Sequence, residues 1–328
     1  KLGFKEVWVG EHVTEKWENA PCPDLLLAKA SAMTENILLG TGVSLLTLHN
    51  PVELGHRIAM LDHLTRGRLQ WGIGHRAIAE DLKLFGLDHL QGDEVRERAA
   101  EALDLILEMW ESEGEFSFKG KYFDINAPAL DPIRERGYHM RPLQQPHPPI
   151  FAAASSSRSA SIRTAAQRGY KPMSSSGLAP RYLAEHWDVI EDAAAEAGTE
   201  VNRSDWRVAR DVFIAETDEL ARERAKAVLG RNYIQHQLPN RANSGQIQNA
   251  KINDNVADDD LDVDYMIDNI WIVGGPKECA EKIRNLYNEV GGFGHLLAIT
   301  QDPDDPSWEH DTLDLLKEEV APLVSDLV

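Results

Sequence analysis

Glu11 and His12 stand side by side directly after the apolar run Val7-Trp8-Val9, and Trp17 follows on the same stretch. An imidazole titrates near neutral pH, so it can donate or accept a proton that a reaction needs to have controlled. The same residue types also occur in ordinary polar loops and among metal ligands. The local sequence therefore leaves three interpretations open: a polar loop, a metal ligand set, or the rim of an active site.

Other apolar runs also end in polar or small side chains. If these runs are parallel strands, their carboxyl ends share one face, where catalytic groups of barrel enzymes gather. That face would carry Glu11 and His12; Thr41, Gly42 and Val43; His75 and Arg76; Ser155, Ser156, Ser157, Arg158 and Ser159; and Ser174, Ser175 and Ser176. Such a set can bind an anion and exchange protons.

The serine cluster beginning at Ser155 lies between an expected strand and an expected helix. Backbone amides and hydroxyls at such a junction form a natural cradle for phosphate. Serine hydroxyls also cap helix starts and close turns, so a purely structural role stays open. The cluster therefore predicts an anion site, with capping as the alternative.

The elements that must position these groups alternate along the chain, which indicates parallel strands joined by crossover helices. Helices are expected from Pro51, from about Asp93 to Glu111, and from Pro276 to about Glu289. The pattern predicts an α/β fold, a (β/α)8 TIM barrel in one domain over residues 1–328, with its first strand before residue 1. A doubly wound open sheet is the alternative. The seven visible strands are 6–10, 37–43, 69–74, 150–155, 171–176, 207–216 and 295–300.

Two stretches interrupt the alternation and are expected to be insertions. Residues 112–149 contain FSFKGKYFD, which indicates a β-hairpin. Residues 230–264 are polar and uneven, and His236 among them reads as a solvated loop residue. Because loops of this length are commonly functional covers or disordered, we expect residues 230–264 to form a mobile cover.

Charge and composition exclude several classes of partner. The chain has 54 acidic and 34 basic side chains, a formal charge of −20, which repels nucleic-acid phosphates and anionic lipid surfaces. No apolar run approaches the ~18 residues of a membrane helix, and KLGFKEVW lacks the apolar centre of a signal peptide. Cys22 and Cys279 form neither a disulfide framework nor a zinc spacing. We expect a cytoplasmic protein without nucleic-acid, membrane or metal partners.

Four linked phrases can be followed along the chain: EH at 11–12, TLHNPVELGHRIAMLDHLTRGRLQWGIGHRAIAEDLKLFGLD at 47–88, the serine cluster, and WIVGGPKECAEKI at 271–283. Together these phrases resemble the bacterial luciferase-like flavin monooxygenases, and the resemblance covers nearly the whole chain. WENAPCPDLLLA at 17–28 and YKPMSSSGL at 170–178 are similar to the diketocamphane and limonene monooxygenase branch. The resemblance implies a luciferase-like barrel and, because the family commonly forms dimers, a homodimer.

The resemblance also implies roles for individual residues near the expected reaction centre. His12 corresponds to the catalytic histidine of the luciferases, and Glu11 either orients it or caps a loop. Val13 stands where the luciferases have a second histidine, which argues against light emission. Trp17 and Ser175 are expected to line the substrate pocket.

Flavin binding is implied at two further places. The non-proline cis peptide that lies beneath the flavin ring in the family falls at Gly42–Val43, next to Thr41. A luciferase arginine that contacts the flavin phosphate falls at His75, with Arg76 adjacent, so either of the two is the expected phosphate contact. The hydroxyl groups expected around the same phosphate are those of Ser155, Ser156 and Ser159.

The resemblance implies a monooxygenase that uses reduced FMN and O2 to oxygenate a small apolar ketone or alkene, terpene-like or cyclic. GIGHRA at 72–77 has the form GxGxxA but lacks an acid at the ribose distance. The chain is therefore not expected to reduce flavin itself, and a separate flavin reductase is expected, with which it need share only a diffusing cofactor. The alternatives are a deazaflavin-dependent dehydrogenase on the same barrel and a noncatalytic flavin-binding subunit.

Overall fold

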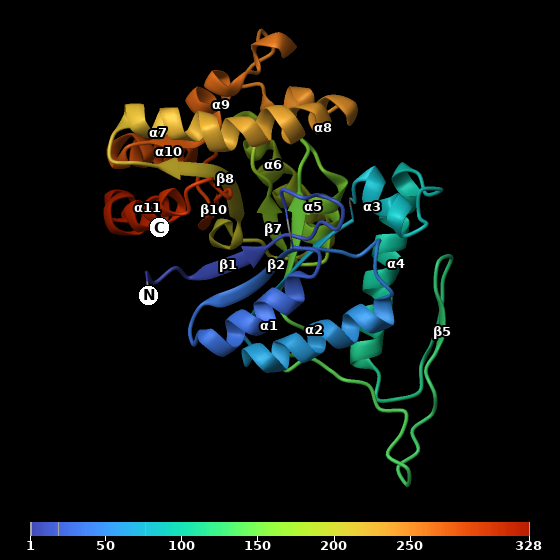
Figure 1. The fold of residues 1–328 in the computed structure, drawn as a ribbon. Helices are drawn as coiled ribbons and strands as arrows, with labels where there is room; N and C mark the ends of the chain where they lie inside the picture. The colour runs from blue at the N-terminus through green and yellow to red at the C-terminus, as the bar shows by residue number, and fades with distance from the viewer. Residues whose placement is uncertain (1, 19, 76, 328) are drawn as a thin grey trace. The chain divides into compact units, whose positions relative to one another are not determined.

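The computed structural model describes residues 2–18, 20–75 and 77–327. By its internal contacts the chain divides into two compact units. The first, here the amino-terminal unit, is residues 4–151, and the second, the carboxyl-terminal unit, is residues 152–328 with 1–3. Each unit is an α/β assembly and is described by itself (Figure 1).

The amino-terminal unit is built on a parallel sheet in the order β1 (Glu6–Val9), β2 (Leu38–Leu45) and β3 (Leu69–Gly74). Val9 pairs with Thr41, and Thr41 pairs with Trp71. These strands confirm the three that were predicted first along the chain. Because they are parallel, the segments after β1, β2 and β3 leave the sheet at the same edge.

The two helices predicted in this unit are confirmed as α2 and α4. The side chain of Asn50 accepts hydrogen bonds from two amides of α2, and Arg66 ends that helix in the left-handed region at φ 58°. A capping box between Gln91 and Glu94 starts α4, and the apolar side chains on one stripe of this helix are buried. Strands β4 (Ser117–Lys119) and β5 (Asp124–Asn126) pair antiparallel and confirm the hairpin. The helices are α1 (Pro23–Met33), α2 (Pro51–Thr65), α3 (Ala79–Leu84) and α4 (Gly92–Glu111).

The carboxyl-terminal unit continues from β6 (Ile150–Ala154), the strand in which the two units divide, and its strands are also parallel. The amide of Ser175, just after β7, donates to the carbonyl of Ala154 at 2.9 Å. Strand β8 pairs with β7 and β10 through its first residues and with the short β9 through its last three. The sequence did not predict β9, because three apolar residues before Gly-Gly-Pro read as the approach to a helix. These strands are β7 (Lys171–Ser174), β8 (Arg207–Ile214), β9 (Ile272–Gly274) and β10 (His295–Ile299).

Helices account for most of the rest of this unit. The helix predicted from Pro276 to Glu289 is confirmed as α10. The α-helices are α5 (Ala160–Gln167), α6 (Pro180–Ala197), α7 (Asp218–Ala225), α8 (Leu238–Asn243), α9 (Val263–Asn269), α10 (Pro276–Glu289), α11 (Ser307–Leu315) and α12 (Ala321–Leu323). Shorter turns or π-type segments are η1 (Arg203–Asp205), η2 (Lys226–Gly230), η3 (Tyr233–Gln237), η4 (Ile247–Ala250), η5 (Asp258–Asp260) and η6 (Leu316–Val320).

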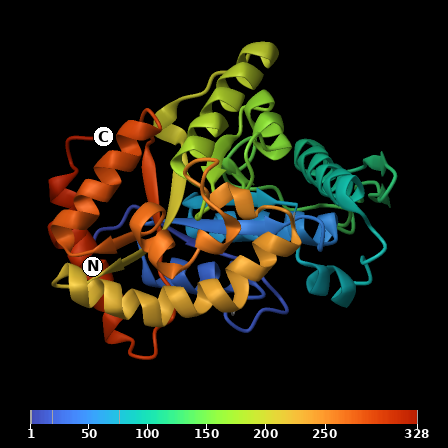
Figure 2. The same ribbon diagram turned by 90° about the horizontal axis from the view of Figure 1, so that it is seen from above.

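The expectation of an irregular segment at 230–264 was wrong for its first part. From α7 the chain continues through η2, η3 and α8 as one long helical run to Asn243 (Figure 2). His236 therefore lies in the helical segment η3 and not in a loop. The sequence did not indicate this helical run, because its buried residues begin before position 230 and alternate with polar side chains. The buried residues that stabilise the run are Ala221, Ala225, Val228, Leu229 and Tyr233. Residues 244–262 contain only short turns, and their role as a cover stays a prediction.

The described residues show the state of both cysteines and the apolar length of the helices. Cys22 is exposed, Cys279 is buried, and both are free thiols. Among the described residues no helix is long and apolar enough to cross a membrane.

Candidate active site

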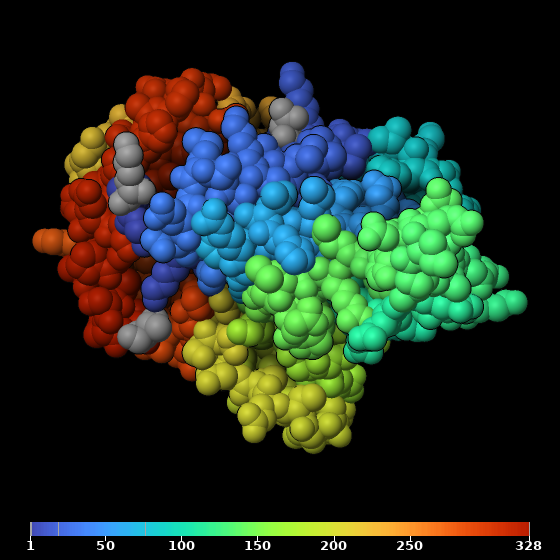
Figure 3. Space-filling model, turned by 90° about the horizontal axis from the view of Figure 1, so that it is seen from below, coloured from blue at the N-terminus to red at the C-terminus, as the bar shows by residue number. Residues whose placement is uncertain are grey.

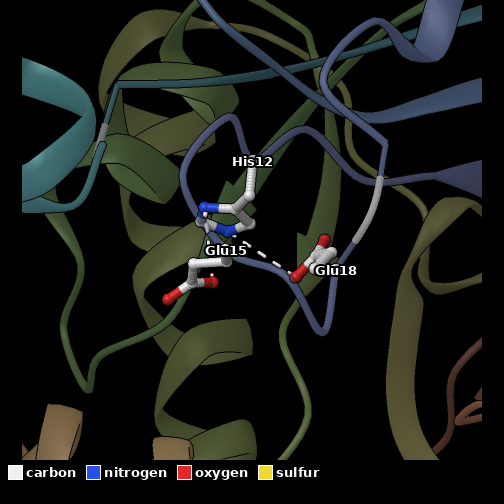
Figure 4. A group of neighbouring side chains, drawn as sticks. All are labelled: His12, Glu15 and Glu18. Carbon is white, nitrogen blue, oxygen red and sulfur yellow. Dashed lines mark ion pairs between the residues drawn. The ribbon is translucent and has the colours of Figure 1, made fainter. Parts of the chain in front are cut away.

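His12 lies on the segment after β1 and is surrounded by three carboxylates of the amino-terminal unit. Its Nδ1 is 3.5 Å from Asp81 Oδ2 and 3.6 Å from Glu15 Oε2. Its Nε2 is 3.7 Å from Glu18 Oε2. Figure 4 shows the imidazole ring reaching between Glu15 and Glu18. Each ring nitrogen thus faces at least one acid, so the site can hold or pass a proton at either nitrogen.

Burial raises the pKa of two acids beside His12. For both Glu15 and Glu18 burial is the largest cause of the raised pKa, and the nearby His12 partly opposes this shift. Both carboxyl groups therefore retain a proton to a higher pH than an exposed glutamate would. Donor and acceptor atoms of His12, Glu15 and Glu18 lie within 4.8 Å of one another, so they could also hold a metal ion, which the sequence analysis did not expect.

Glu11 is directed away from His12. Its Oε2 accepts a hydrogen bond from the amide of Leu45 at 2.7 Å, and its Oε1 lies 2.6 Å from His49 Nε2. The side chain is buried, and it ties the segment after β1 to the end of β2. Of the two roles expected for Glu11, the geometry favours anchoring the loop, with His49 as a partner that the sequence did not indicate.

Trp17 and His12 lie close together, as the sequence suggested. Their ring centroids are 6.4 Å apart, and the ring planes are tilted by 32°. Trp17 is half-buried on the same segment. An indole at this distance supplies apolar surface next to the imidazole, which limits the access of water.

Residues 41–43 lie within β2, next to β1 and β3. Thr41 is fully buried, and its hydroxyl donates to the carbonyl of Gly72 at 2.8 Å. The peptide bond between Gly42 and Val43 is cis, as the resemblance predicted. His75 follows β3, is half-buried, and accepts a hydrogen bond at its carbonyl from the hydroxyl of Thr47. Arg76 lies outside the described residues.

The serine cluster of the carboxyl-terminal unit leads into α5. Ser155 is exposed, and Ser159 is buried with its Oγ 2.7 Å from Ser161 Oγ. The side chain of Ser159 caps none of the described first-turn amides of α5. These amides point out of the helix start and suit an anion. The residues present therefore fit a phosphate group at this position.

A sequence profile of the luciferase-like monooxygenases matches residues 1–292. The chain belongs to this family. 2,5-Diketocamphane 1,2-monooxygenase 1 of Pseudomonas putida is 30% identical over 334 residues, which cover 99% of this chain and 90% of that protein. Limonene 1,2-monooxygenase of Rhodococcus erythropolis is 30% identical over 98% of this chain and 78% of that protein.

A solved structure supports the same assignment. The oxygenating constituent of 3,6-diketocamphane monooxygenase from Pseudomonas putida, a type II Baeyer–Villiger monooxygenase solved with FMN, superposes with a TM-score of 0.89. It is 30% identical, and the match covers 98% of this chain and 89% of that one. The luciferase-like monooxygenase described here thus has the predicted (β/α)8-barrel class of fold.

Other predicted residues of this luciferase-like monooxygenase have structural partners. Ser175, expected in the substrate pocket, is half-buried and bonds through its amide to Ala154. Ser174 is fully buried, with its Oγ 2.9 Å from both His186 Nδ1 and Trp206 Nε1. Burial lowers the pKa of His186, which favours the neutral imidazole, and both ring nitrogens are engaged by Ser174 and the carbonyl of Ser156.

Asp81 is the functional candidate that sequence reasoning missed. It belongs to α3, it is fully buried, and its Oδ1 accepts hydrogen bonds from the amide and hydroxyl of Thr14 at 2.9 and 2.7 Å. In the sequence it is one of two adjacent acids in the phrase IAEDLKLFG, 69 positions after His12. Local patterning gives no signal that this carboxylate reaches His12.

Proposed function

We propose that this luciferase-like monooxygenase uses reduced FMN and O2 to oxygenate a small, largely apolar ketone or alkene of terpene-like or cyclic form. The observation that carries the proposal is His12, held at the end of a barrel strand among acids and beside Trp17, in a chain of this family. The substrate class follows the diketocamphane and limonene relatives. Bound reduced FMN supplies the oxygen-activating chemistry.

The residues of the amino-terminal unit control the proton and the environment. His12 exchanges the proton that accompanies oxygen transfer, and Trp17 keeps water from the reacting edge of the flavin. We assign the flavin ring to Thr41, Gly42 and Val43. In this proposal His12 exchanges the proton, and the group that it forms with Glu15 and Glu18 holds no metal.

In the carboxyl-terminal unit the proposal assigns the FMN phosphate to the start of α5, with Ser155, Ser156 and Ser159 as donors. His75 or Arg76 supplies positive charge to the phosphate, and Ser175 belongs to the substrate pocket. A separate flavin reductase in the cytoplasm delivers the reduced cofactor, because GIGHRA lacks the acid that a nicotinamide dinucleotide site needs.

Oxygen uptake with product analysis tests the proposed activity. Purified protein is mixed with photoreduced FMN in air, and bicyclic ketones and limonene are screened for lactone or epoxide. We expect an oxygenated product with FMN. Hydride transfer with a reduced deazaflavin, without oxygen uptake, would instead establish the dehydrogenase alternative. Flavin binding without turnover of any member of the panel would favour a noncatalytic subunit.

Replacing Ser156 and Ser159 together with alanine should weaken FMN binding by roughly 10²-fold or more, because hydrogen bonds to a charged group contribute about 1.5–3 kcal/mol each. Riboflavin lacks the phosphate, so its affinity should change less than that of FMN. Fluorescence quenching of both flavins measures the two affinities. Equal losses for both flavins would place the phosphate elsewhere.

We also propose that the protein is a homodimer that associates through α1 and α2. In the space-filling view of Figure 3, atoms in the blue and light-blue range of the colour bar that includes α1 and α2 lie on the face turned to the viewer. The large apolar side chains exposed on them are Leu25, Leu26 and Met33 of α1 and Met60 and Leu64 of α2. Helices α1 and α2 contact one another, and large exposed apolar side chains on neighbouring helices are typical of an interface between protein chains.

The double substitution of Met33 and Met60 by glutamate should convert the dimer to a monomer, because it places charge in an apolar interface. Light scattering after size exclusion measures the mass. Ile133→Glu is the control, since Ile133 is 91% exposed on the 112–149 segment and outside the two helices. A monomeric wild-type protein, or a double variant that remains dimeric, would contradict this interface.

A further inference from the structure

We propose that Asp81 is a positioning residue for His12, which keeps the Nδ1 of the imidazole protonated and leaves Nε2 to exchange the proton with the reacting group. This inference rests on the proposed function, in which His12 controls that proton. It adds Asp81, which lies on α3, to the residues that act on His12, which lies on the segment after β1.

One buried polar atom of His12 faces one buried polar atom of Asp81. His12 Nδ1 and Asp81 Oδ2 are each buried and have no hydrogen-bond partner among the described residues. The distance between these two atoms is 3.5 Å. A buried polar atom without a partner is unfavourable, and a small rotation of the ring that lets Nδ1–H donate to Oδ2 satisfies both atoms.

The carboxylate of Asp81 is fixed in place by other hydrogen bonds. Its side chain is 0% exposed, and the amide and hydroxyl of Thr14 both donate to its other oxygen, Oδ1. Thr14 lies only two residues after His12. One carboxylate therefore holds both the backbone of the His12 segment and the orientation of the His12 ring. A carboxylate that fixes the tautomer of a catalytic imidazole in this way is a recurrent arrangement in enzymes.

The other acids near His12 are less suited to this role. Glu15 Oε2 is 3.6 Å from the same Nδ1, but Glu15 is 12% exposed, and burial raises its pKa, which disfavours its charged form relative to that of an exposed glutamate. Glu80 adds to the negative charge around Glu15. Glu18 faces Nε2, the opposite nitrogen, and Glu11 is engaged by His49 and Leu45. Asp81 is the buried acid whose position on Nδ1 is fixed by other bonds.

The direct test is the tautomer of His12 in the free protein, which needs neither flavin nor turnover. Histidine labelled with 15N is incorporated, His12 is assigned by comparison with His12→Ala, and long-range 1H–15N spectra are recorded at a pH where the ring is neutral. We expect the Nδ1–H form in the wild type and a mixture or the Nε2–H form in Asp81→Asn. A wild-type ring in the Nε2–H form would overturn the inference, whatever the variant does.

Kinetics give a second readout. Asp81→Asn should lower kcat by roughly 10²-fold with FMN affinity within about 2-fold of wild type, and the limb of the pH–rate profile that His12 controls should move to lower pH. Glu15→Gln is the matched control, because it removes a carboxylate at nearly the same distance from Nδ1. We expect it to keep the Nδ1–H tautomer and to have the smaller effect on kcat.

The two outcomes separate this inference from the proposed function. If folded Asp81→Asn keeps the wild-type pH profile and differs from wild type only in thermal stability, Asp81 is structural and the inference fails. If His12→Ala turns over normally while the wild-type tautomer is Nδ1–H, the pairing stands and the catalytic role of His12 fails.

Discussion

We expect the replacement of His12 with alanine to lower product formation by ~10²-fold or more, the scale on which a positioned acid or base contributes to a reaction. Folding and FMN binding should remain nearly intact, because the ring is partly exposed and its contacts to Glu15, Glu18 and Asp81 are longer than hydrogen bonds. Initial rates with saturating reduced FMN measure the effect, and circular dichroism with FMN titration verifies that the variant is folded and loaded.

The structural alternative for His12 predicts the opposite pattern. If His12 only neutralises the surrounding acids, its loss lowers stability while the folded fraction turns over normally. Val13→His is an informative companion variant, since it restores the second histidine of the luciferase phrase without touching His12. Normal turnover of folded His12→Ala would leave only a flavin-binding role for this segment.

Replacing Gly72 with alanine should destabilise the protein by roughly 3 kcal/mol or more, since a core with no room for added atoms loses both packing and backbone geometry. A β-carbon on Gly72 would lie 2.0 Å from the carbonyl oxygen of Thr41, a backbone atom of the neighbouring strand. The strand pair β2–β3 must therefore separate around the residues assigned to the flavin ring. Urea unfolding measures the loss.

Gly86→Ala is the control for Gly72→Ala. A β-carbon on Gly86 meets no described atom within 4 Å, so its cost is only that of a left-handed backbone at φ 68°, about 1–2 kcal/mol. Equal losses in the two variants would show that strand β2 can move away from Gly72 without penalty.

Local sequence patterns were sufficient to predict most of the strands and the long helix α2. The seven predicted strands are all present, because continuous β-rich apolar runs bounded by turns mark buried parallel strands. Asn50 with Pro51 and the left-handed turn at Arg66 and Gly67 place α2 where the capping residues indicate. The cis peptide at Gly42–Val43 required a different signal, the family resemblance, because composition and periodicity carry no information about it.

The side-chain contacts of His12 and Glu11 could not be predicted from local sequence patterns. Asp81 meets His12 across 69 positions, and Glu11 turns toward His49 and not toward its neighbour. Both contacts depend on how separate loops fold back over the ends of the strands, which local patterning does not encode. The helical run to Asn243 was missed for another reason. Its buried stripe is narrow, and polar side chains around it hide the period.

The most direct test of the central claim is the origin of the oxygen atom in the product. The wild-type protein, reduced FMN and a ketone or alkene from the panel are incubated under 18O2 in unlabelled water, and the product is analysed by mass spectrometry. We predict one 18O atom per product molecule, formed at a rate that His12→Ala lowers by ~10²-fold or more. Product that carries only 16O, or 18O2 consumed to hydrogen peroxide with no labelled product from any substrate, would contradict the assignment as a monooxygenase.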